Sequence, residues 1–283
     1  MSKSYLNQLK TQTEKTGSIV CMGIDPVAEK IPIKGSPGVK IVRFYLDILE
    51  TMQAERVFPA IVKPNIAFFE QYDFEGFIAL KKIMSEYRKA KIPIILDAKR
   101  GDIGKTSTAY AESIFNGWKA DATTINPYMG SDSVMPFIEY CKEGKGAYVL
   151  VRTSNKGAKD FEDLKVKKDP VYMKVAKKLI NWHKPGVGAV VGATSPRELA
   201  KISEFFVKSK KKIPLLIPGV GAQGGSAKEV IKALKKTNNP VYLHRINSSS
   251  GINYAYLKAK NNQSDYAGAA VKALKELNKE INI

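Results

Sequence analysis

The chain has 283 residues, of which 44% are hydrophobic and 26% are charged, and its formal net charge is +19 at pH 7. This composition can fill a sizeable core and excludes wholesale disorder, and no apolar run reaches the ~20 residues that a membrane-spanning helix needs. Residues 1–17 are polar and lack the apolar core of a signal peptide. Because Cys21 and Cys141 have no metal-ligand spacing, we expect a cytoplasmic protein with reduced thiols and no membrane partner.

Apolar segments alternate with amphipathic segments along the whole chain. The apolar segments predict eight strands, at residues 18–24, 57–62, 92–96, 121–125, 147–151, 187–191, 213–217 and 241–246. The amphipathic segments predict helices at residues 39–55, 71–90, 105–118, 131–142, 169–182, 196–209, 226–236 and 264–280. Eight such alternations favour an α/β fold, a single-domain (β/α)8 TIM barrel over residues 1–283, rather than two Rossmann halves.

Local signals mark some of the boundaries of these elements. Capping-box sequences at Ser195 and Ser226 predict the starts of two helices. Loops 26–38 and 155–168 are long enough to form lids or insertions. We find no linker, short repeat or low-complexity tract that would divide the chain.

The strong positive charge raises the question of nucleic-acid binding. Lysines are scattered over nearly every helix-like segment, as at residues 208–212 and 232–236, and no arginine-rich tract is interleaved with aromatic residues. We therefore interpret the charge as solvated helix faces that attract an anionic substrate, and we expect no nucleic-acid partner. A basic nucleic-acid-binding barrel without catalysis remains an alternative.

The end of the third predicted strand is unusually charged. In a (β/α)8 barrel the active site lies where the strands end in loops at the carboxyl-terminal face. Asp97 and Lys99 share one face of this strand because side chains alternate, and Asp102 follows on the loop. If Lys63 turns inward from the end of the second strand, two lysines and two aspartates form an alternating array. The carboxylates then allow the lysines to stay charged while partly buried.

Polar residues also end other predicted strands, at Asp25, Asn126, Ser154 and Gly219. Residues 218–225 contain a formal G-x-G-x-x-G, but no acidic residue ends the next strand, as a dinucleotide-binding fold would require. We interpret this segment as a glycine loop after the seventh barrel strand, where backbone N–H groups and a helix N-terminus bind phosphate.

Other catalytic motifs are missing from the sequence. His183 and His244 are too few and too far apart for a histidine-based metal site. No G-x-S-x-G elbow occurs, and nothing signals a pyridoxal or thiamin site. We expect neither a metal nor an organic cofactor.

The motifs together resemble a known family. Residues 97–106, DAKRGDIGKT, are similar to the D-x-K-x-x-D-I-x-x-T signature of the orotidine 5′-phosphate decarboxylase family, in its divergent D-A-K-R-G-D-I-G branch. Further blocks match in the expected order, at residues 23–26, 62–64, 126–132, 152–155 and 218–224. The resemblance implies a homodimer that converts orotidine 5′-monophosphate to UMP in de novo pyrimidine synthesis, without a cofactor.

The resemblance also implies a role for each matching residue. Lys99 would stabilise and protonate the C6 carbanion, with Asp97 near the departing carboxylate. Lys63 and Asp102 would hold Lys99, and Asp102 would come from the partner subunit. The implied substrate-binding residues are Asp25 at the ribose, Ile103 and Thr106 across the interface, Ser154 at the pyrimidine, Pro218, Gln223 and Gly224 in the phosphate loop, and Ser250.

Ser250 departs from the family pattern. The family usually has a phosphate-binding arginine there, in a sequence like N-x-S-R-x-I-x-Y, and a serine lacks its bidentate charge. Losing one such contact costs about 2–5 kcal/mol when the phosphate is desolvated. Arg245 is near in sequence but falls inside the predicted strand.

Two further alternatives stay open. The D-x-K-x-x-D motif alone is shared with sugar-phosphate enzymes of the same barrel group, so a Mg²⁺-dependent aldolase of the hexulose-phosphate synthase type is possible on this motif. Ser250 also leaves open a degenerate decarboxylase without activity.

Overall fold

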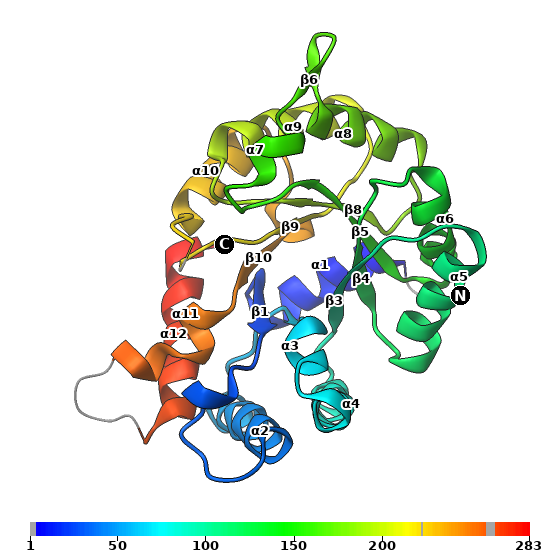
Figure 1. Cartoon of the computed structure of the whole chain (residues 1–283). Coiled ribbons are helices and arrows are strands. Elements are labelled where there is room, and N and C mark those ends of the chain that lie inside the picture. The colour runs from blue at the N-terminus through cyan, green and yellow to red at the C-terminus, as the bar shows by residue number, and fades with distance from the viewer. Residues whose placement is uncertain (1–3, 222, 259–263) are drawn as a thin grey trace.

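The computed structural model describes residues 4–221, 223–258 and 264–283. Within these residues, eight parallel strands form one sheet in the order β2-β1-β10-β9-β8-β5-β4-β3 (Figure 1). The two end strands meet through the bridges Val62–Ile94 and Asn65–Asp97, so the sheet closes on itself. The predicted (β/α)8 barrel is confirmed, and all the strands have their carboxyl ends at the same mouth.

The barrel strands overlap the predicted ones. Their bounds are β1 (Val20–Ile24), β2 (Ile61–Pro64), β3 (Ile95–Arg100), β4 (Ala122–Ile125), β5 (Gly146–Arg152), β8 (Val187–Val191), β9 (Leu215–Ile217) and β10 (Arg245–Ser248). The last prediction was misplaced, because residues 241–243 form a 3₁₀ turn after Pro240 and the strand begins only at Arg245.

The predicted helices also form, and they surround the sheet. Their bounds are α2 (Pro37–Glu55), α4 (Asp73–Lys89), α5 (Gly104–Glu112), α6 (Ser131–Glu139), α8 (Val171–Asn181), α9 (Pro196–Lys208), α10 (Ala227–Lys236) and α12 (Tyr266–Ile281). Ser226 caps α10 by accepting a hydrogen bond from the amide of Glu229 at 3.4 Å. Ser195 makes no such bond, because its ψ of 71° departs from the extended conformation that directs a cap side chain at the helix amides. Within the described residues, none of the helices combines the length and apolar character needed to span a bilayer.

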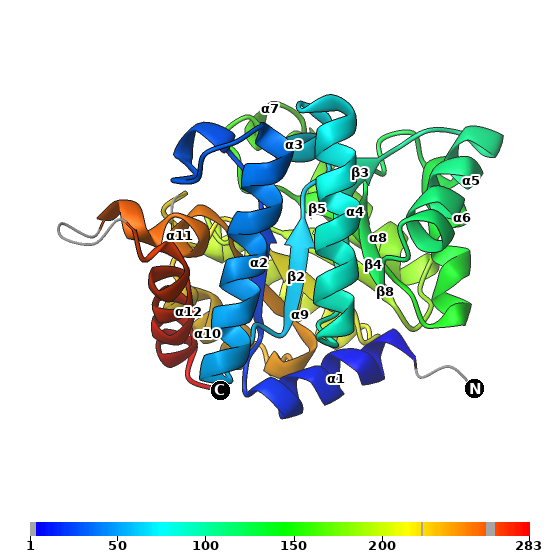
Figure 2. The same cartoon turned by 90° about the horizontal axis from the view of Figure 1, so that it is seen from below.

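Apart from helices of four residues, one described helix has no counterpart among the predicted segments. The helix α1 (Tyr5–Thr16) lies across the amino-terminal end of the barrel, opposite the mouth (Figure 2). Tyr5 and Leu9 pack into the barrel interior, and the hydroxyl of Tyr5 donates to that of Tyr148 at 3.2 Å. Arg245 is fully buried beside α1 and donates to the carbonyl of Leu9 at 2.7 Å. This arrangement closes the end of the barrel opposite the mouth.

The two long loops contain short elements of their own. Residues 26–38 include the 3₁₀ turn η1 (Ala28–Lys30). Residues 155–168 include the helix α7 (Ala158–Phe161) and the strand β6 (Lys165–Val166), which pairs antiparallel with β7 (Asp169–Pro170) in a hairpin that projects from the barrel (Figure 1). Short helices α3 (Ala67–Glu70) and α11 (Ser250–Asn253) follow β2 and β10.

Candidate active site

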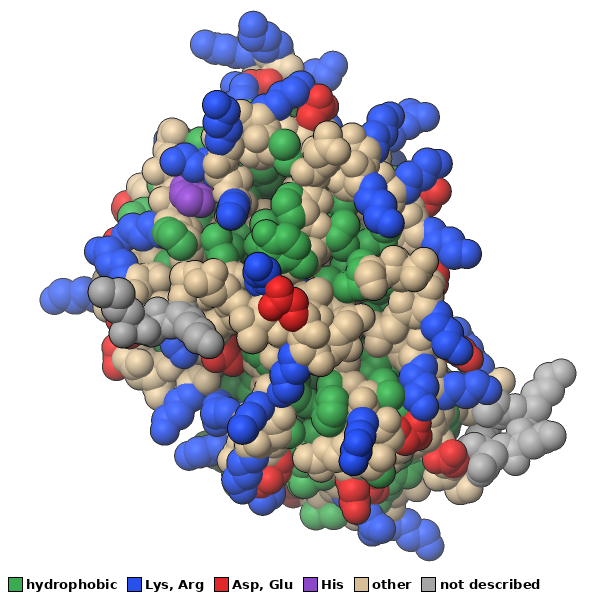
Figure 3. All heavy atoms as spheres, turned by 180° about the vertical axis from the view of Figure 1, so that it is seen from behind, with side chains coloured by type: hydrophobic (Ala, Val, Ile, Leu, Met, Phe, Trp, Pro, Cys, Tyr) green, Lys and Arg blue, Asp and Glu red, His purple; other side chains and the backbone are tan. Residues whose placement is uncertain are grey.

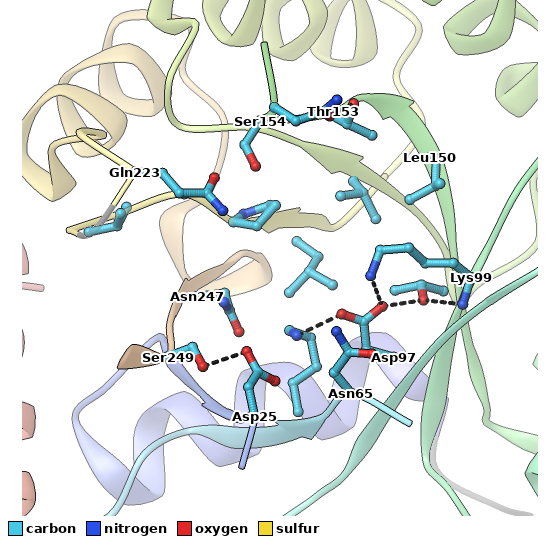
Figure 4. A pocket seen from close by; sticks show the side chains of 18 of the residues that line it. Asp25, Asn65, Asp97, Lys99, Leu150, Thr153, Ser154, Gln223, Asn247 and Ser249 are labelled. Atoms are coloured by element: carbon cyan, nitrogen blue, oxygen red, sulfur yellow. Dashed lines mark hydrogen bonds and ion pairs between the residues drawn. The ribbon is translucent and has the colours of Figure 1, made fainter. Parts of the chain in front are cut away.

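A cavity of about 420 Å³ opens at the carboxyl ends of the strands (Figure 4). Most of the predicted site residues line it: Asp25, Lys63, Asp97, Lys99, Ser154, Pro218, Gln223 and Ser250. The predicted residues Asp102, Ile103, Thr106 and Gly224 lie outside its lining. The residues that the sequence placed on different strands therefore come together at the barrel mouth.

Asp97 is the centre of the charge array. It stands on β3 with a side chain only 7% exposed, and its two oxygens contact two different lysines. Lys63 Nζ lies 2.7 Å from Oδ2, and Lys99 Nζ lies 2.8 Å from Oδ1. Lys63 therefore turns inward, as the predicted array requires. The lysines differ in exposure, because the side chain of Lys63 is 5% exposed and that of Lys99 is 48% exposed.

The array keeps its buried groups charged. Burial alone would raise the pKa of Asp97, but the positive charges of Lys63 and Lys99 outweigh it and hold this pKa well below the usual range. Burial likewise opposes the charge on Lys63, and the negative charges of Asp97 and Asp25 raise the pKa of Lys63 above its ordinary value. Asp97 is thus a carboxylate and Lys63 an ammonium at neutral pH.

A bulge in β3 brings Lys99 back over Asp97. The register between β3 and β4 shifts between Leu96 and Arg100, and Lys99 has a left-handed φ of 45°. The amide of Lys99 donates to the hydroxyl of Thr124 at 3.0 Å, and that hydroxyl donates to Asp97 Oδ1 at 2.7 Å. The sequence reading missed Thr124, although strand alternation puts it on the same face as the inward-facing Ala122.

Asp25 forms a second polar group at the mouth, next to β1. Ser249 donates its hydroxyl to Oδ2 of Asp25, whereas Oδ1 is buried and has no partner within the described part of the chain. Oδ1 of Asn247, another cavity residue, is also buried without one. Buried acceptors in proteins normally have a donor. A ligand with adjacent hydroxyl groups would supply donors to both.

The end of β5 holds Ser154 on the other side of the cavity, near Gln223 (Figure 4). The buried Arg152 makes two bonds to Asp163, at 2.8 and 3.1 Å, and the amide of Thr153 donates to Glu162 at 2.8 Å. The carbonyl of Ser154 accepts from Thr194 at 2.9 Å. Residues of the 155–168 loop thus fix the segment that carries Ser154.

The glycine loop after β9 borders the same side. Gly219, Gly221 and Gly224 have φ values of 98°, 85° and 85°, a region that side chains with a Cβ rarely adopt. Backbone bonds close the loop on itself, with the amide of Gly225 donating to Gly219 at 2.9 Å. Gln223 points from this loop into the cavity, and Ser250 lines it at the start of α11. Arg245 lies at the opposite end of the barrel, so it cannot take the place of an arginine at position 250.

Asp102 does not join the array within one chain. It is half-buried, and its Oδ1 accepts from the amide of Ile103 at 2.8 Å. Ile103 and Thr106 are exposed at the start of α5. A single chain therefore brings together three of the four predicted charges.

The sequence reading missed part of the lining. The additional cavity residues are Asn65, Phe68, Thr124, Leu150, Thr153, Asn155, Val190, Leu216, Val220, Asn247 and Ser249. The apolar ones on β5, β8 and β9 could have been found from alternation within each strand. Asn247 and Ser249 match the N-x-S part of the family pattern before Ser250, and this pattern is the sequence signal that could have identified them.

The comparisons with known proteins agree with this geometry. Residues 18–255 match the model of the orotidine 5′-phosphate decarboxylase / HUMPS family. The chain is 37% identical to the orotidine 5′-phosphate decarboxylase of Halorubrum lacusprofundi over 99% of both chains, and 38% identical to that of Delftia acidovorans over 94% of both. It also superposes on the structure of Leishmania donovani OMP decarboxylase with a TM-score of 0.76 and 33% identity, covering 99% of this chain and 100% of that one. The chain therefore belongs to the orotidine 5′-phosphate decarboxylase / HUMPS family.

Proposed function

We propose that this protein decarboxylates orotidine 5′-monophosphate to UMP in de novo pyrimidine synthesis. The observation that carries the proposal is the contact of Asp97 with both Lys63 and Lys99 at the mouth of the barrel. Loss of CO2 from the pyrimidine leaves an electron pair on C6 in an sp² orbital that no carbonyl group delocalises. Fixed positive charge next to that carbon is what lowers the barrier.

Lys99 is the residue that we assign to the reacting carbon. Its ammonium is the more exposed of the two and reaches the cavity from the rim (Figure 4). As the bond between C6 and the carboxyl carbon breaks, its electron pair stays on C6. A proton from Lys99 then forms the new C6–H bond, and Lys99 regains a proton from solvent. Asp97 lies near the departing carboxylate and, with Lys63, holds the ammonium in place.

Other cavity residues bind the nucleotide in this proposal. The free Oδ1 of Asp25 accepts from the ribose hydroxyls. Ser154 faces the pyrimidine edge, and Gln223 closes over the phosphate together with Pro218 and the glycine loop that contains Gly224. Ser250 adds a neutral hydroxyl at the phosphate. Binding energy from these remote groups supports the reaction at C6 by excluding water and fixing the ring.

We also infer that the enzyme is a homodimer in which Asp102 completes the site of the partner subunit. Asp102 lies outside the cavity of its own chain, and Ile103 and Thr106 next to it are exposed. On the neighbouring loop, Tyr128 is 87% exposed and Met129 is 45% exposed. Apolar side chains on one rim suit a subunit interface. The buried, unpaired thiols of Cys21 and Cys141 fit the cytoplasm.

The geometry favours this activity over the alternatives. A Mg²⁺-dependent aldolase needs free carboxylate oxygens, whereas both oxygens of Asp97 contact ammonium groups. A nucleic-acid-binding barrel needs a continuous basic surface. Figure 3 shows that on one face the Lys and Arg side chains lie mainly toward the periphery, with Asp and Glu among them and hydrophobic and uncharged groups in between.

The test is the loss of orotate ultraviolet absorbance when the purified protein meets orotidine 5′-monophosphate. We expect turnover that a chelator does not inhibit. Lys99→Ala should abolish turnover and leave UMP binding largely intact. Wild-type turnover by this variant would overturn the assignment of Lys99, and chelator-sensitive aldol chemistry without CO2 release would overturn the proposed activity.

A further inference from the structure

Thr124 occupies a special place in the sheet. Leu96 pairs with Thr123, and Arg100 pairs with Ile125. Residues 97–99 therefore all stand opposite the single residue Thr124, and the regular ladder of hydrogen bonds between β3 and β4 is interrupted there. Thr124 is 1% exposed and lines the cavity.

The hydroxyl of Thr124 replaces the missing ladder bond. It accepts a hydrogen bond from the amide of Lys99 at 3.0 Å and donates one to Asp97 Oδ1 at 2.7 Å. These directions are fixed, because an amide can only donate and an ionised carboxylate can only accept. The single proton of the hydroxyl is thereby used within the protein. It is not available to a substrate.

Both partners of Thr124 belong to the charge array. On one side the hydroxyl holds the backbone of Lys99 in its left-handed conformation, with φ of 45°. On the other side it holds the same carboxylate oxygen that Lys99 Nζ contacts at 2.8 Å. The main chain of Lys99 is thus held by the hydroxyl of Thr124, and its side chain by Oδ1 of Asp97, to which the same hydroxyl donates. This closed arrangement sets where the ammonium of Lys99 lies.

We propose that Thr124 is a positioning residue that holds Lys99 and Asp97 in the geometry needed for proton transfer to C6. This inference rests on the proposed role of Lys99. Thr124 acts on the chemical step through its two partners. It does not contribute to binding of the nucleotide, so removal of its hydroxyl lowers kcat and leaves the affinity for UMP unchanged.

The experiment uses three variants of the full-length protein. Thr124→Val removes the hydroxyl and keeps the shape of the side chain, Thr124→Ser keeps the hydroxyl, and Thr123→Val is the matched control. Thr123 is the adjacent buried residue of β4, and its hydroxyl donates to the carbonyl of Leu96 at 2.8 Å, away from the array. For each we measure kcat and KM for orotidine 5′-monophosphate and Kd for UMP.

We expect Thr124→Val to lower kcat about 10- to 100-fold, the effect of losing a hydrogen bond to a charged group. The KM of Thr124→Val and its Kd for UMP should equal the wild-type values. The ratio of its kcat to the wild-type kcat should stay constant from pH 6 to 8, because Lys63 and Lys99 still keep Asp97 ionised. Thr124→Ser and Thr123→Val should retain turnover close to wild type. If the valine variant does not fold, Thr124→Ala is compared with Thr124→Ser in its place.

Three results would overturn the inference: wild-type kcat in Thr124→Val, a loss of UMP affinity as large as the loss of kcat, or a serine variant as slow as the valine variant. Failure of the underlying function is recognised separately. It would appear as chelator-sensitive chemistry without CO2 release by the wild-type protein. Failure of the role assigned to Lys99 would appear as wild-type turnover in Lys99→Ala, whereas wild-type turnover in Thr124→Val alone leaves both intact.

Discussion

Lys63→Met removes the most buried positive charge of the site and leaves an unbranched side chain in its place. Asp97, whose side chain is 7% exposed, then keeps only Lys99, whose side chain is 48% exposed. Removing one partner of a buried ion pair destabilises a protein by about 3–5 kcal/mol. We expect this loss in the free energy of unfolding at pH 7, together with a strong reduction in turnover, because Lys63 no longer holds the carboxylate of Asp97 that orients Lys99.

The pKa shifts of Asp97 and Lys63 predict how this loss of stability depends on pH. The lowered pKa of Asp97 stabilises the wild type above the unfolded value of about 4, and this stabilisation is lost as the pH falls below it. The raised pKa of Lys63 stabilises the wild type below the unfolded value of about 10.4, and that part is lost as the pH rises above it. The difference in stability between wild type and Lys63→Met should therefore be constant between these limits and become smaller outside them.

The assay is urea denaturation of both proteins across this pH range, with Lys82→Met as the control. Lys82 pairs with Glu86 at 2.9 Å on an exposed helix face, and its loss should change stability little at any pH. A Lys63→Met variant as stable as the wild type would refute the reasoning. A stability difference that persists unchanged at pH 3 would do so as well.

The remaining predictions concern other parts of the site. Ser250→Arg should tighten UMP binding, measured by calorimetry, because it adds a charged donor at the phosphate; unchanged affinity would mean that another group already binds it. Asp25→Asn should raise Kd for UMP much more than Kd for inorganic phosphate, since the proposed contact of Asp25 is to the ribose; equal losses would contradict this. Lys99→Ala and Asp102→Ala should each be inactive alone, yet after unfolding and refolding together they should regain about a quarter of wild-type turnover, because half of the dimers then carry one intact site. No recovery would argue against a shared site.

Much of the fold was accessible from the sequence, because alternation of apolar and amphipathic segments reports burial directly. The amino-terminal helix α1 was not, because most of its surface is polar and only Tyr5, Leu9 and two further positions face the barrel. The role of Arg245 was also hard to predict from the sequence. A charged residue near a strand end suggests a ligand, but its guanidinium is used by backbone carbonyls at the closed end of the barrel.

The charged part of the site was predictable for a different reason. Charged residues at the ends of buried strands are costly unless they are paired, so Lys63, Asp97 and Lys99 stand out in the sequence. Thr124 does not stand out, because threonine is a common strand residue. Its importance depends on the bulge in β3, and a change of register between two strands leaves no mark in the spacing of apolar residues.

The different burial of Lys63 and Lys99 gives them different roles in the proposed mechanism. Both contact the same carboxylate at nearly the same distance, 2.7 Å for Lys63 and 2.8 Å for Lys99. Charge alone therefore cannot tell which of them protonates C6. A general acid must reach its acceptor and then exchange its proton with solvent, which a side chain only 5% exposed cannot do readily. Lys63 stays charged and offsets the cost of burying Asp97. Because Lys63 offsets this cost, Lys99 can pair with Asp97 and still be 48% exposed, which in the proposed mechanism puts its ammonium within reach of both the substrate and water.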